Sequence, residues 1–475
     1  MADSEPMTQP EITADSVEEY LKAQDDKGLL RFITCGSVDD GKSTLIGRLL
    51  YETKLIFEDQ LKTLEAESKK LGTQGEKLDL ALLVDGLSAE REQGITIDVA
   101  YRFFATEKRK FIVADTPGHE QYTRNMATGA STAEVAVILI DARKGVLTQT
   151  RRHSRIASMV GIRHVVVAIN KMDLAGYDQA VFEEIAEEYR AAVAEHDFAS
   201  ITCIPLSALE GDNVIARSER MAWYDGPTLL DYLESVQVGE AASESRLRMS
   251  VQWVNRPNLD FRGFTGRIGA GRVRKGDSVR VLPSGTTTTV ERIVSYDGDL
   301  EEAVAGQSVT LTLAEEVDVS RGDVIAAADN PPEVADQFEI KLLWMHEHAM
   351  LPGRSYVVKI GRRSVNGTVT EIKHLVDVNS GAHLAGKQVP LNGIAVVNVS
   401  FDREVVFEPY ERNPDLGACI FIDRMTNETV GAGMIEFALR RASNIHWQAL
   451  AVDKQTRASL KHPTARCLWF TGLSG

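Results

Sequence analysis

The sequence predicts an α/β domain with a mostly parallel sheet and helices on both faces, followed by two small antiparallel β-barrels. From Leu29 to about Val236, apolar runs of strand length alternate with helical patterns, as in a parallel sheet whose crossovers are helices. From Leu247 the pattern changes to short alternating segments that are punctuated by glycine and proline. This pattern persists from Phe338 through Phe437, so the region is long enough for two barrels.

Five apolar runs provide the strands of the predicted sheet. Each run is nearly continuous rather than alternating, which is typical of strands that are covered on both faces. They are Leu29–Cys35, Lys110–Ala114, Val135–Ile140, His164–Ile169 and Ser200–Pro205. A long polar stretch, Gln60–Leu83, lies between the first two, and we interpret it as a solvated helix that leads into a mobile loop.

Changes in composition divide the chain into five segments. Residues 1–27 are acidic and poor in large apolar groups, which predicts a mobile tail. The paired prolines Pro331-Pro332 mark a junction between the two barrels. The predicted segments are the tail at 1–27, the α/β domain at 28–240, the barrels at 245–332 and 333–455, and a last segment at 456–475.

Length and charge argue against several classes of protein. At 475 residues the chain has material for about three domains, each with its own core. The formal net charge of −16 argues against a general nucleic-acid binder, and we interpret the basic clusters Arg440-Arg441 and Lys454–His462 as solvated faces. No apolar run approaches the ~20 residues of a membrane span, and the acidic N-terminus is unlike a secretory signal. We therefore expect a cytoplasmic protein.

The cysteines and a histidine pair show no metal-binding pattern. No Asp, Glu or Cys companion at metal spacing is evident for His346 and His348, so we interpret them as residues of a barrel loop. No C-x-x-C spacing occurs, so we expect buried reduced thiols rather than disulfides or a zinc site. The cysteines are Cys35, Cys203, Cys419 and Cys467.

A glycine-rich turn follows the first predicted strand and precedes a helical pattern at Leu45–Tyr51. Strand, glycine-rich turn and helix are the context that a phosphate-binding loop requires, because backbone N–H groups and the helix N-terminus then face the phosphates. Lys42 can reach the β- and γ-phosphates, and the Ser43 hydroxyl can ligate Mg²⁺. The loop residues are Gly36, Ser37, Val38, Asp39, Asp40, Gly41, Lys42, Ser43 and Thr44.

Two further segments fit the γ-phosphate side of such a site. Asp115 ends a strand, where its carboxylate can hold the shell of Mg²⁺, and Gly118 allows its N–H to approach the γ-phosphate. Upstream, Thr96 lies in a loop where its hydroxyl can meet the metal and the γ-phosphate. Alternatively, Asp115 to Gly118 is simply a turn. A β-branched strand that begins at Ile95 is the alternative for the Thr96 segment, and both can hold, since a loop can dock and then run into a strand.

The last two motifs identify the base. Asp173 follows the fourth predicted strand and can accept two hydrogen bonds from guanine, a donor pair that adenine lacks. Asn170 can tie loops together, and the aliphatic stem of Lys171 can cover the base. The segment Ser207, Ala208 and Leu209 follows the last strand and can present backbone N–H groups to guanine O6. Five pieces in this order, each at a strand end, predict a P-loop GTPase domain that binds GTP.

The chain resembles the translation-factor class of GTPases and, within it, the large subunits of bacterial ATP sulfurylases. The resemblance covers nearly the whole chain from Gly28. Elongation factors typically have histidine where this chain has Asp40, so Ser37 and Asp40 favour the sulfurylase branch. The matching segments are Gly36–Thr44, Val84–Asp98, Asp115–Met126 and Val254–Gly266.

The resemblance implies a role and a partner. It implies a GTPase subunit whose GTP hydrolysis is coupled to the formation of adenosine 5′-phosphosulfate and pyrophosphate by a small catalytic subunit. It assigns the orientation of the attacking water to His119. From the motifs above, we expect catalysis also from Lys42 and Thr96, with Mg²⁺ held by Ser43, Thr96 and Asp115. Since no arginine finger is evident in the chain, we expect the small subunit to accelerate hydrolysis. The alternatives are a translation factor that delivers aminoacyl-tRNA and a scaffold that binds GTP without hydrolysing it.

The last ten residues, Arg466–Gly475, carry a separate resemblance. They are similar to the opening of adenylylsulfate kinase, where a strand leads into a second phosphate loop. That loop would begin at Gly472, before its lysine, which leads us to expect a bifunctional enzyme with a fused kinase domain. The alternatives are a relic of such a domain or an apolar tail.

Overall fold

A computed structural model gives the structure of the protein, and it describes residues 27–53, 64, 68, 78–84, 96, 98–238, 245–258 and 261–439. The predicted tail, most of Gln60–Leu83, Cys467 and the last segment lie outside these residues. Of the polar stretch, Leu80–Leu83 forms a short 3₁₀ helix. In the part that is described, no helix is long and apolar enough to cross a membrane.

The N-terminal domain contains a six-stranded sheet in the order β2-β3-β1-β4-β5-β6. All neighbouring strands are parallel except β2 and β3, which are antiparallel. The five predicted strands are confirmed. The edge strand β2 was not among them, and the strand that the sequence analysis offered as an alternative from Ile95 lies just before it in the sequence. The strands are β1 Leu29–Cys35, β2 Ala100–Ala105, β3 Lys110–Asp115, β4 Val135–Asp141, β5 His164–Asn170 and β6 Ser200–Pro205.

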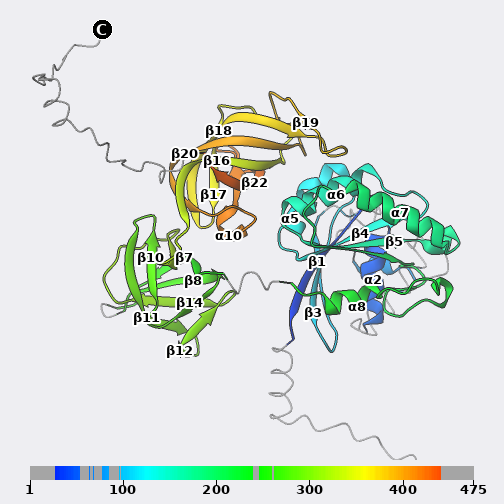
Figure 1. The fold of residues 1–475 in the computed structure, drawn as a ribbon, viewed down its shortest axis with the longest axis horizontal. Helices are drawn as coiled ribbons and strands as arrows, with labels where there is room; N and C mark the ends of the chain where they lie inside the picture. The colour runs from blue at the N-terminus through cyan, green and yellow to red at the C-terminus, as the bar shows by residue number, and fades with distance from the viewer. Residues whose placement is uncertain are drawn as a thin grey trace, which may run out of the picture.

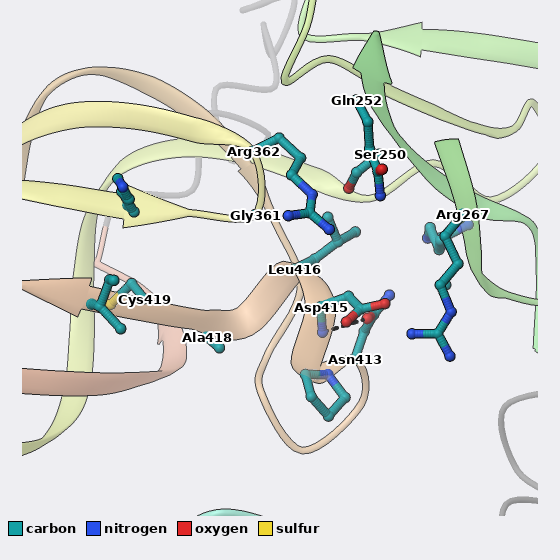
Figure 2. A pocket seen from close by; sticks show the side chains of 15 residues that line it. Ser250, Gln252, Arg267, Gly361, Arg362, Asn413, Asp415, Leu416, Ala418 and Cys419 are labelled. Carbon is teal, nitrogen blue, oxygen red and sulfur yellow. Dashed lines mark hydrogen bonds between the residues drawn. The ribbon is translucent and has the colours of Figure 1, made fainter. Parts of the chain in front are cut away.

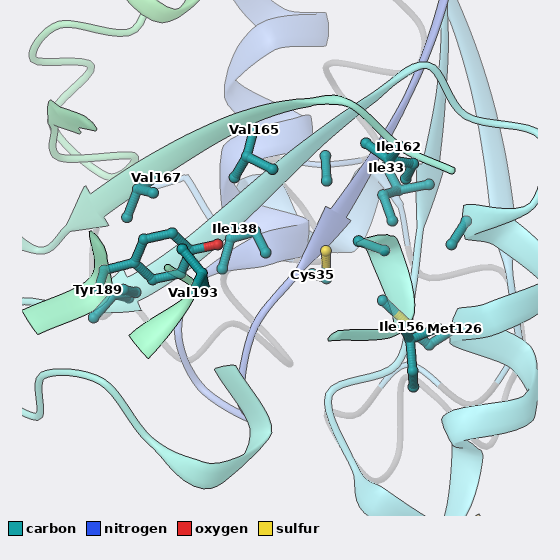
Figure 3. Close-up of a cluster of buried hydrophobic side chains, with 14 of the residues drawn as sticks. Ile33, Cys35, Met126, Ile138, Ile156, Ile162, Val165, Val167, Tyr189 and Val193 are labelled. Carbon is teal, nitrogen blue, oxygen red and sulfur yellow. The ribbon is translucent and has the colours of Figure 1, made fainter. Parts of the chain in front are cut away.

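Helices cover both faces of this sheet (Figure 1). On β1, Ile33 and Cys35 face a core that includes Met126, Ile156 and Tyr189, whereas alternate residues face the opposite core. Figure 3 shows the first of these cores, with Tyr189 and Ile156 on opposite sides of Ile138. The helices of the first face are α5 Thr123–Ala130, α6 Thr148–Met159 and α7 Gln179–Ala192, and those of the second are α2 Lys42–Glu52 and α8 Leu229–Ser235.

The first barrel closes as a ring of six antiparallel strands, β10-β15-β7-β8-β14-β11, because β10 also pairs with β11. Its core consists of inward-facing apolar residues such as Val251 and Ile268. The strands are β7 Arg248–Asn255, β8 Gly263–Ala270, β9 Arg272–Arg274, β10 Ser278–Leu282, β11 Thr286–Ser295, β12 Gly298–Leu300, β13 Glu302–Val304, β14 Ser308–Leu313 and β15 Val324–Ala327.

The second barrel closes in the same way, as the ring β17-β21-β22-β16-β20-β18 with a β17–β18 pairing. Its first strand begins at Glu333, directly after Pro331-Pro332. Two antiparallel barrels after a parallel-rich α/β domain confirm the predicted fold class. The elements are β16 Glu333–Trp344, β17 Ser355–Ile360, β18 Arg363–Val376, β19 His383–Leu384, β20 Ile394–Phe407, α10 Pro414–Gly417, β21 Ala418–Ile422 and β22 Thr429–Ala438.

The second barrel contacts both other domains. Its Asn392 side chain donates to the carbonyl of Glu120 at 2.9 Å, and the Tyr410 hydroxyl donates to the carbonyl of Val160 at 2.8 Å. Between the barrels, Arg248 pairs with Glu408 at 2.7 Å. The α/β domain is therefore joined to the second barrel beside the segment that follows Asp115.

The predicted cysteine chemistry agrees with the structure where it is described. The three described cysteines, at positions 35, 203 and 419, are free and buried. Burial raises the pKa of the Cys35 thiol to about 12, so it stays protonated at neutral pH. His346 and His348 lie in the loop after β16, where the His346 ring accepts a hydrogen bond from the His348 N–H at 3.1 Å.

Candidate nucleotide-binding site

The predicted phosphate loop, residues 36–44, connects β1 to α2 at the carboxyl edge of the sheet. Gly41 caps α2 in a left-handed conformation with φ of 93°. A Cβ atom at Gly41 would lie 2.4 Å from the Asn170 amide nitrogen, so only glycine fits. Ser43 and Thr44 lie in the first turn of α2, where backbone N–H groups have no acceptor within the helix and are suited to binding an anion.

Two charged side chains hold this loop from within. The Lys42 ammonium donates to the carbonyls of Ser37 at 2.7 Å and Gly36 at 3.3 Å. The Asp40 carboxylate accepts the N–H of Ser37 at 2.6 Å. Burial lowers the pKa of Lys42 and raises the pKa of Asp40. Ser37 and Asp40 are the two positions that distinguish this loop from that of elongation factors. The backbone of the first and the side chain of the second are therefore hydrogen-bonded to each other inside the loop.

Three oxygen-bearing side chains from distant segments meet beside the loop. Asp115, at the end of β3, accepts a hydrogen bond from Ser43 at 2.8 Å and one from Thr96 at 3.4 Å. The Ser43 and Thr96 hydroxyls are 3.5 Å apart. Asp115 is fully buried, and this burial raises its pKa. The three residues predicted to hold a metal are thus brought together, although they are far apart in the sequence.

The segment after Asp115 approaches the loop closely and then turns outward. A Cβ atom at Gly118 would lie 2.6 Å from the Lys42 ammonium and 2.8 Å from the Val38 nitrogen, so a side chain does not fit there. The next residue, His119, is exposed, and its Nδ1 accepts the N–H of Gln121 at 3.3 Å. Glu120 pairs with Arg152 of α6 at 2.7 Å. Gly118 therefore lies against the phosphate loop, whereas His119 lies at the surface beside it.

Asn170 connects two loops, as the sequence analysis predicted. Its amide nitrogen donates to the Asp40 carbonyl at 2.7 Å, and its amide oxygen accepts the Ala208 N–H at 2.9 Å. The side chain is 2% exposed, so neither bond competes with water. The phosphate loop and the loop after β6 are therefore held in a fixed relation.

Lys171 and Asp173 lie on the next turn. Lys171 adopts a left-handed conformation, and its ammonium donates to the Asp39 carbonyl and pairs with Asp141 at 3.0 Å. Although burial opposes ionisation, hydrogen bonds from Arg143 and Lys171 hold the pKa of the Asp141 carboxyl below its usual range. One buried carboxylate oxygen of Asp173 has no hydrogen-bond partner among the described residues. It is a polar atom that needs a donor.

The loop Ser207–Leu209 is fixed by side chains from elsewhere. The Ala208 N–H is already used by Asn170, and the Ser207 N–H donates to the Asp212 carbonyl at 3.2 Å. On α2, Arg48 donates to the carbonyl of Ala208 at 3.0 Å and also to that of Leu209. In this loop, the N–H of Leu209 is the one that has no hydrogen-bond acceptor among the described residues.

Family models match all three domains. The GTP-binding domain of elongation factor Tu matches residues 27–238, and domain 2 of elongation factor Tu matches residues 264–326. The C-terminal domain of eEF1A-like GTPases matches residues 337–436. The chain is thus built from the domains of the translation-factor class in their usual order.

Comparison of nearly the whole chain with known proteins identifies a family within this class. Sulfate adenylyltransferase subunit 1 of Yersinia enterocolitica is 57% identical over 446 residues, which cover 94% of this chain and 93% of that protein. The chain belongs to the sulfate adenylyltransferase subunit 1 family. The bifunctional enzyme NodQ of a Rhizobium strain is 60% identical over 97% of this chain and 71% of its own length. The bifunctional enzyme CysN/CysC of Xylella fastidiosa is 59% identical over 97% of this chain and 74% of its own.

One buried hydrogen bond at the phosphate loop could not be predicted from the sequence. The N–H of Gly36 donates to Nδ1 of His153, on α6, at 3.1 Å. Burial, and then the charges of Lys42 and Arg152, lower the pKa of His153 to about 3. The imidazole is therefore neutral and serves as an acceptor for the start of the phosphate loop. Its position in an amphipathic helix, 117 residues from Gly36, gave no hint of this role.

Proposed function

We propose that this protein is the GTP-hydrolysing subunit of ATP sulfurylase. Its hydrolysis of GTP is coupled to the formation of adenosine 5′-phosphosulfate and pyrophosphate from ATP and sulfate, a reaction catalysed by a small partner subunit. The meeting of Ser43, Thr96 and Asp115 beside the Lys42 loop carries the GTPase part of this proposal. Membership of the subunit 1 family supports the sulfurylase part.

The residues present fit a triphosphate and a magnesium ion. Mg²⁺ would neutralise charge that develops between the β- and γ-phosphates during transfer. Ser43 and Thr96 offer hydroxyl oxygens to it, and Asp115 offers a carboxylate that already accepts hydrogen bonds from both. The outer N–H groups of residues 36–44 and the Lys42 ammonium bind the phosphate oxygens. These groups stabilise negative charge, which is the main contribution a protein makes to phosphoryl transfer.

Guanine is selected at the carboxyl edge of β5. The Asp173 carboxylate, one of whose oxygens lacks a partner, accepts from the two guanine donors, and adenine leaves it unsatisfied. The Lys171 stem, held by Asp141 and the Asp39 carbonyl, covers one face of the base. The Leu209 N–H is the donor that the Ser207–Leu209 loop has left for guanine O6.

Exposed His119 is the residue that orients the attacking water. It follows Gly118, whose backbone lies against Lys42 and Val38, so a small rotation of this segment brings the imidazole toward the γ-phosphate. A neighbouring ion pair, between Glu120 and Arg152, anchors the segment to α6. The partner subunit is well placed to favour the inward position, since His119 is at the surface.

The sulfurylation chemistry belongs to the partner. The described residues after position 245 form two barrels whose interiors are filled with apolar side chains, such as Val251 in the first and Val397 in the second. A translation factor is the less favoured alternative, because two relatives that match over 94% of this chain are named sulfate adenylyltransferase subunit 1. We place the protein in the cytoplasm, and the kinase domain expected after residue 475 stays a prediction.

Reconstitution with the small subunit tests the partnership. The two subunits are co-expressed, co-purified and compared with this chain alone for GTP turnover. We expect slow hydrolysis by the single chain and at least ~10-fold faster hydrolysis in the complex, because a partner completes many GTPase sites. Failure to co-purify, or equal turnover with and without the small subunit, would contradict the proposal.

A further inference from the structure

A cleft lies between the two barrels, and all the residues that line it belong to the barrels rather than to the α/β domain. Its volume is about 350 Å³, which is within the range of small-ligand sites. One wall comes from β7 and β8 of the first barrel, and the other from the β17–β18 turn, α10 and β21 of the second. Figure 2 shows this arrangement, with Arg267 on the first wall and Arg362 on the second.

The cleft collects positive charge that the protein leaves unpaired. Arg267, Lys359 and Arg362 line it, and none of them has an ion pair with a described residue, although Nε of Arg267 donates to the carbonyl of Gly306 at 3.3 Å. Arg248 also lines it, but Glu408 neutralises that side chain at 2.7 Å. Asp415 is the single carboxylate among the lining residues. The lining therefore carries an excess of cations on a chain whose net charge is −16.

The two arginines suit one chemical class of ligand. Each guanidinium presents a planar fork of N–H donors that matches the oxygens of phosphate, sulfate or carboxylate. In Figure 2 they reach into the cleft from different barrels, with Asp415 between them. Ser250 and Gln252, also in the lining, are neutral polar groups of β7. An anion with several oxygens bridges such a pair better than a single carboxylate does.

We propose that this cleft is a second anion site, which binds a phosphate or sulfate group through Arg267 and Arg362. The group is either a free oxyanion or part of a nucleotide, since the same donors serve both. Because the two arginines come from different barrels, the bound group also links the barrels to one another. The inference stands on the barrels alone and does not depend on what the α/β domain hydrolyses.

The test is a binding titration of the full chain, with GDP and Mg²⁺ in excess so that the phosphate loop is occupied. Sulfate, pyrophosphate and adenosine 5′-phosphosulfate are titrated separately by calorimetry. We expect at least one of them to bind with a stoichiometry of one. Binding of sulfate or pyrophosphate identifies a free oxyanion as the ligand, and binding of the nucleotide alone identifies a nucleotide.

Variants distinguish binding at this specific site from a general attraction of anions to positively charged side chains. Arg362→Ala and Arg267→Ala should each weaken binding ~10-fold or more, because each removes charge-assisted hydrogen bonds. Arg424→Ala is the matched control, since this exposed arginine lies beyond the far end of β21. Asp415→Asn should tighten binding, which a misfolded variant does not do. The proposal is overturned if none of the three compounds binds, or if Arg362→Ala and Arg424→Ala behave alike.

Discussion

The nucleotide site and the cleft between the barrels differ in how their charges are satisfied. In the nucleotide site, Lys42 donates to two carbonyls and Lys171 pairs with Asp141, so each cation already has protein partners. In the cleft, Arg267 donates one hydrogen bond to the carbonyl of Gly306 at 3.3 Å, but neither Arg267 nor Arg362 has a carboxylate partner among the described residues. The first site is preorganised by its own hydrogen bonds, whereas the second depends on an outside anion to complete it.

This difference predicts opposite responses to the loss of a charge. Removing a group from the nucleotide site leaves its buried partners unsatisfied, which costs binding and stability together. Removing an exposed cleft arginine costs little stability and affects only the anion. The variants of Lys42 and His153 below test the first half of this contrast, and the titration of the cleft tests the second.

Replacement of Lys42 should have the largest effect. We expect Lys42→Ala to reduce GTP hydrolysis by roughly 1000-fold, because one preorganised cation at developing charge contributes that much. Multiple-turnover release of phosphate measures it. Lys108→Ala is the control, since this exposed lysine pairs with Glu234 away from the site. Residual activity within about tenfold of wild type would remove Lys42 from the proposed mechanism.

The base-reading residue should give the next largest effect. Asp173→Asn turns an acceptor into a donor, so we expect GTP affinity to fall by ~100-fold or more, and preference to shift toward xanthosine triphosphate. Competition against a fluorescent GTP analogue measures both affinities. Asp178→Asn is a matched control, because Asp178 caps the next helix, α7. An unchanged preference for GTP would refute the assignment of Asp173.

The buried histidine should give the smallest effect on binding, and a distinctive dependence on pH. His153→Phe removes the acceptor for the Gly36 N–H, which should weaken GTP binding about tenfold. Native His153 takes up a proton only near pH 3, but the unfolded chain does so near 6.5. The unfolded state therefore binds more protons between these values, and wild type loses up to about 1.4 kcal/mol per pH unit as pH falls through this window.

Thermal unfolding at pH 7 and pH 5 checks this dependence. The midpoint of wild type should fall more between the two pH values than that of His153→Phe. His348→Phe, at an exposed position, serves as the control and should follow wild type. Identical shifts in all three proteins would show that His153 stays accessible to protons in the native state.

Much of the fold and of the nucleotide site could be predicted from the sequence, because both depend on patterns of residues that are contiguous in the chain. Apolar runs set five strands of the sheet, and each motif stands at a strand end, where chain direction alone brings Asn170 close to the phosphate loop. The edge strand β2 was not listed because Arg102 interrupts the apolar run of Ala100–Ala105, in which Tyr101 and Phe103 are exposed. Its partner β3 was needed to recognise it.

Contacts between distant segments could not be predicted in the same way. His153 reaches Gly36 only because α6 packs across the sheet, and Arg48 reaches the Ala208 loop only because α2 lies beside it. The cleft between the barrels combines residues near positions 250, 267, 360 and 415, each unremarkable in its own stretch of sequence. Such sites depend on how the two barrels pack against each other. The pattern of residues within one stretch of sequence does not determine this packing.

The most direct test of the account is coupling itself. The reconstituted complex with the small subunit is supplied with ATP and sulfate, and pyrophosphate release is measured with and without GTP. The account predicts that GTP increases the amount of pyrophosphate released, in step with GTP hydrolysed, and that a complex containing Lys42→Ala loses this increase. Equal pyrophosphate release with and without GTP in the wild-type complex would contradict it.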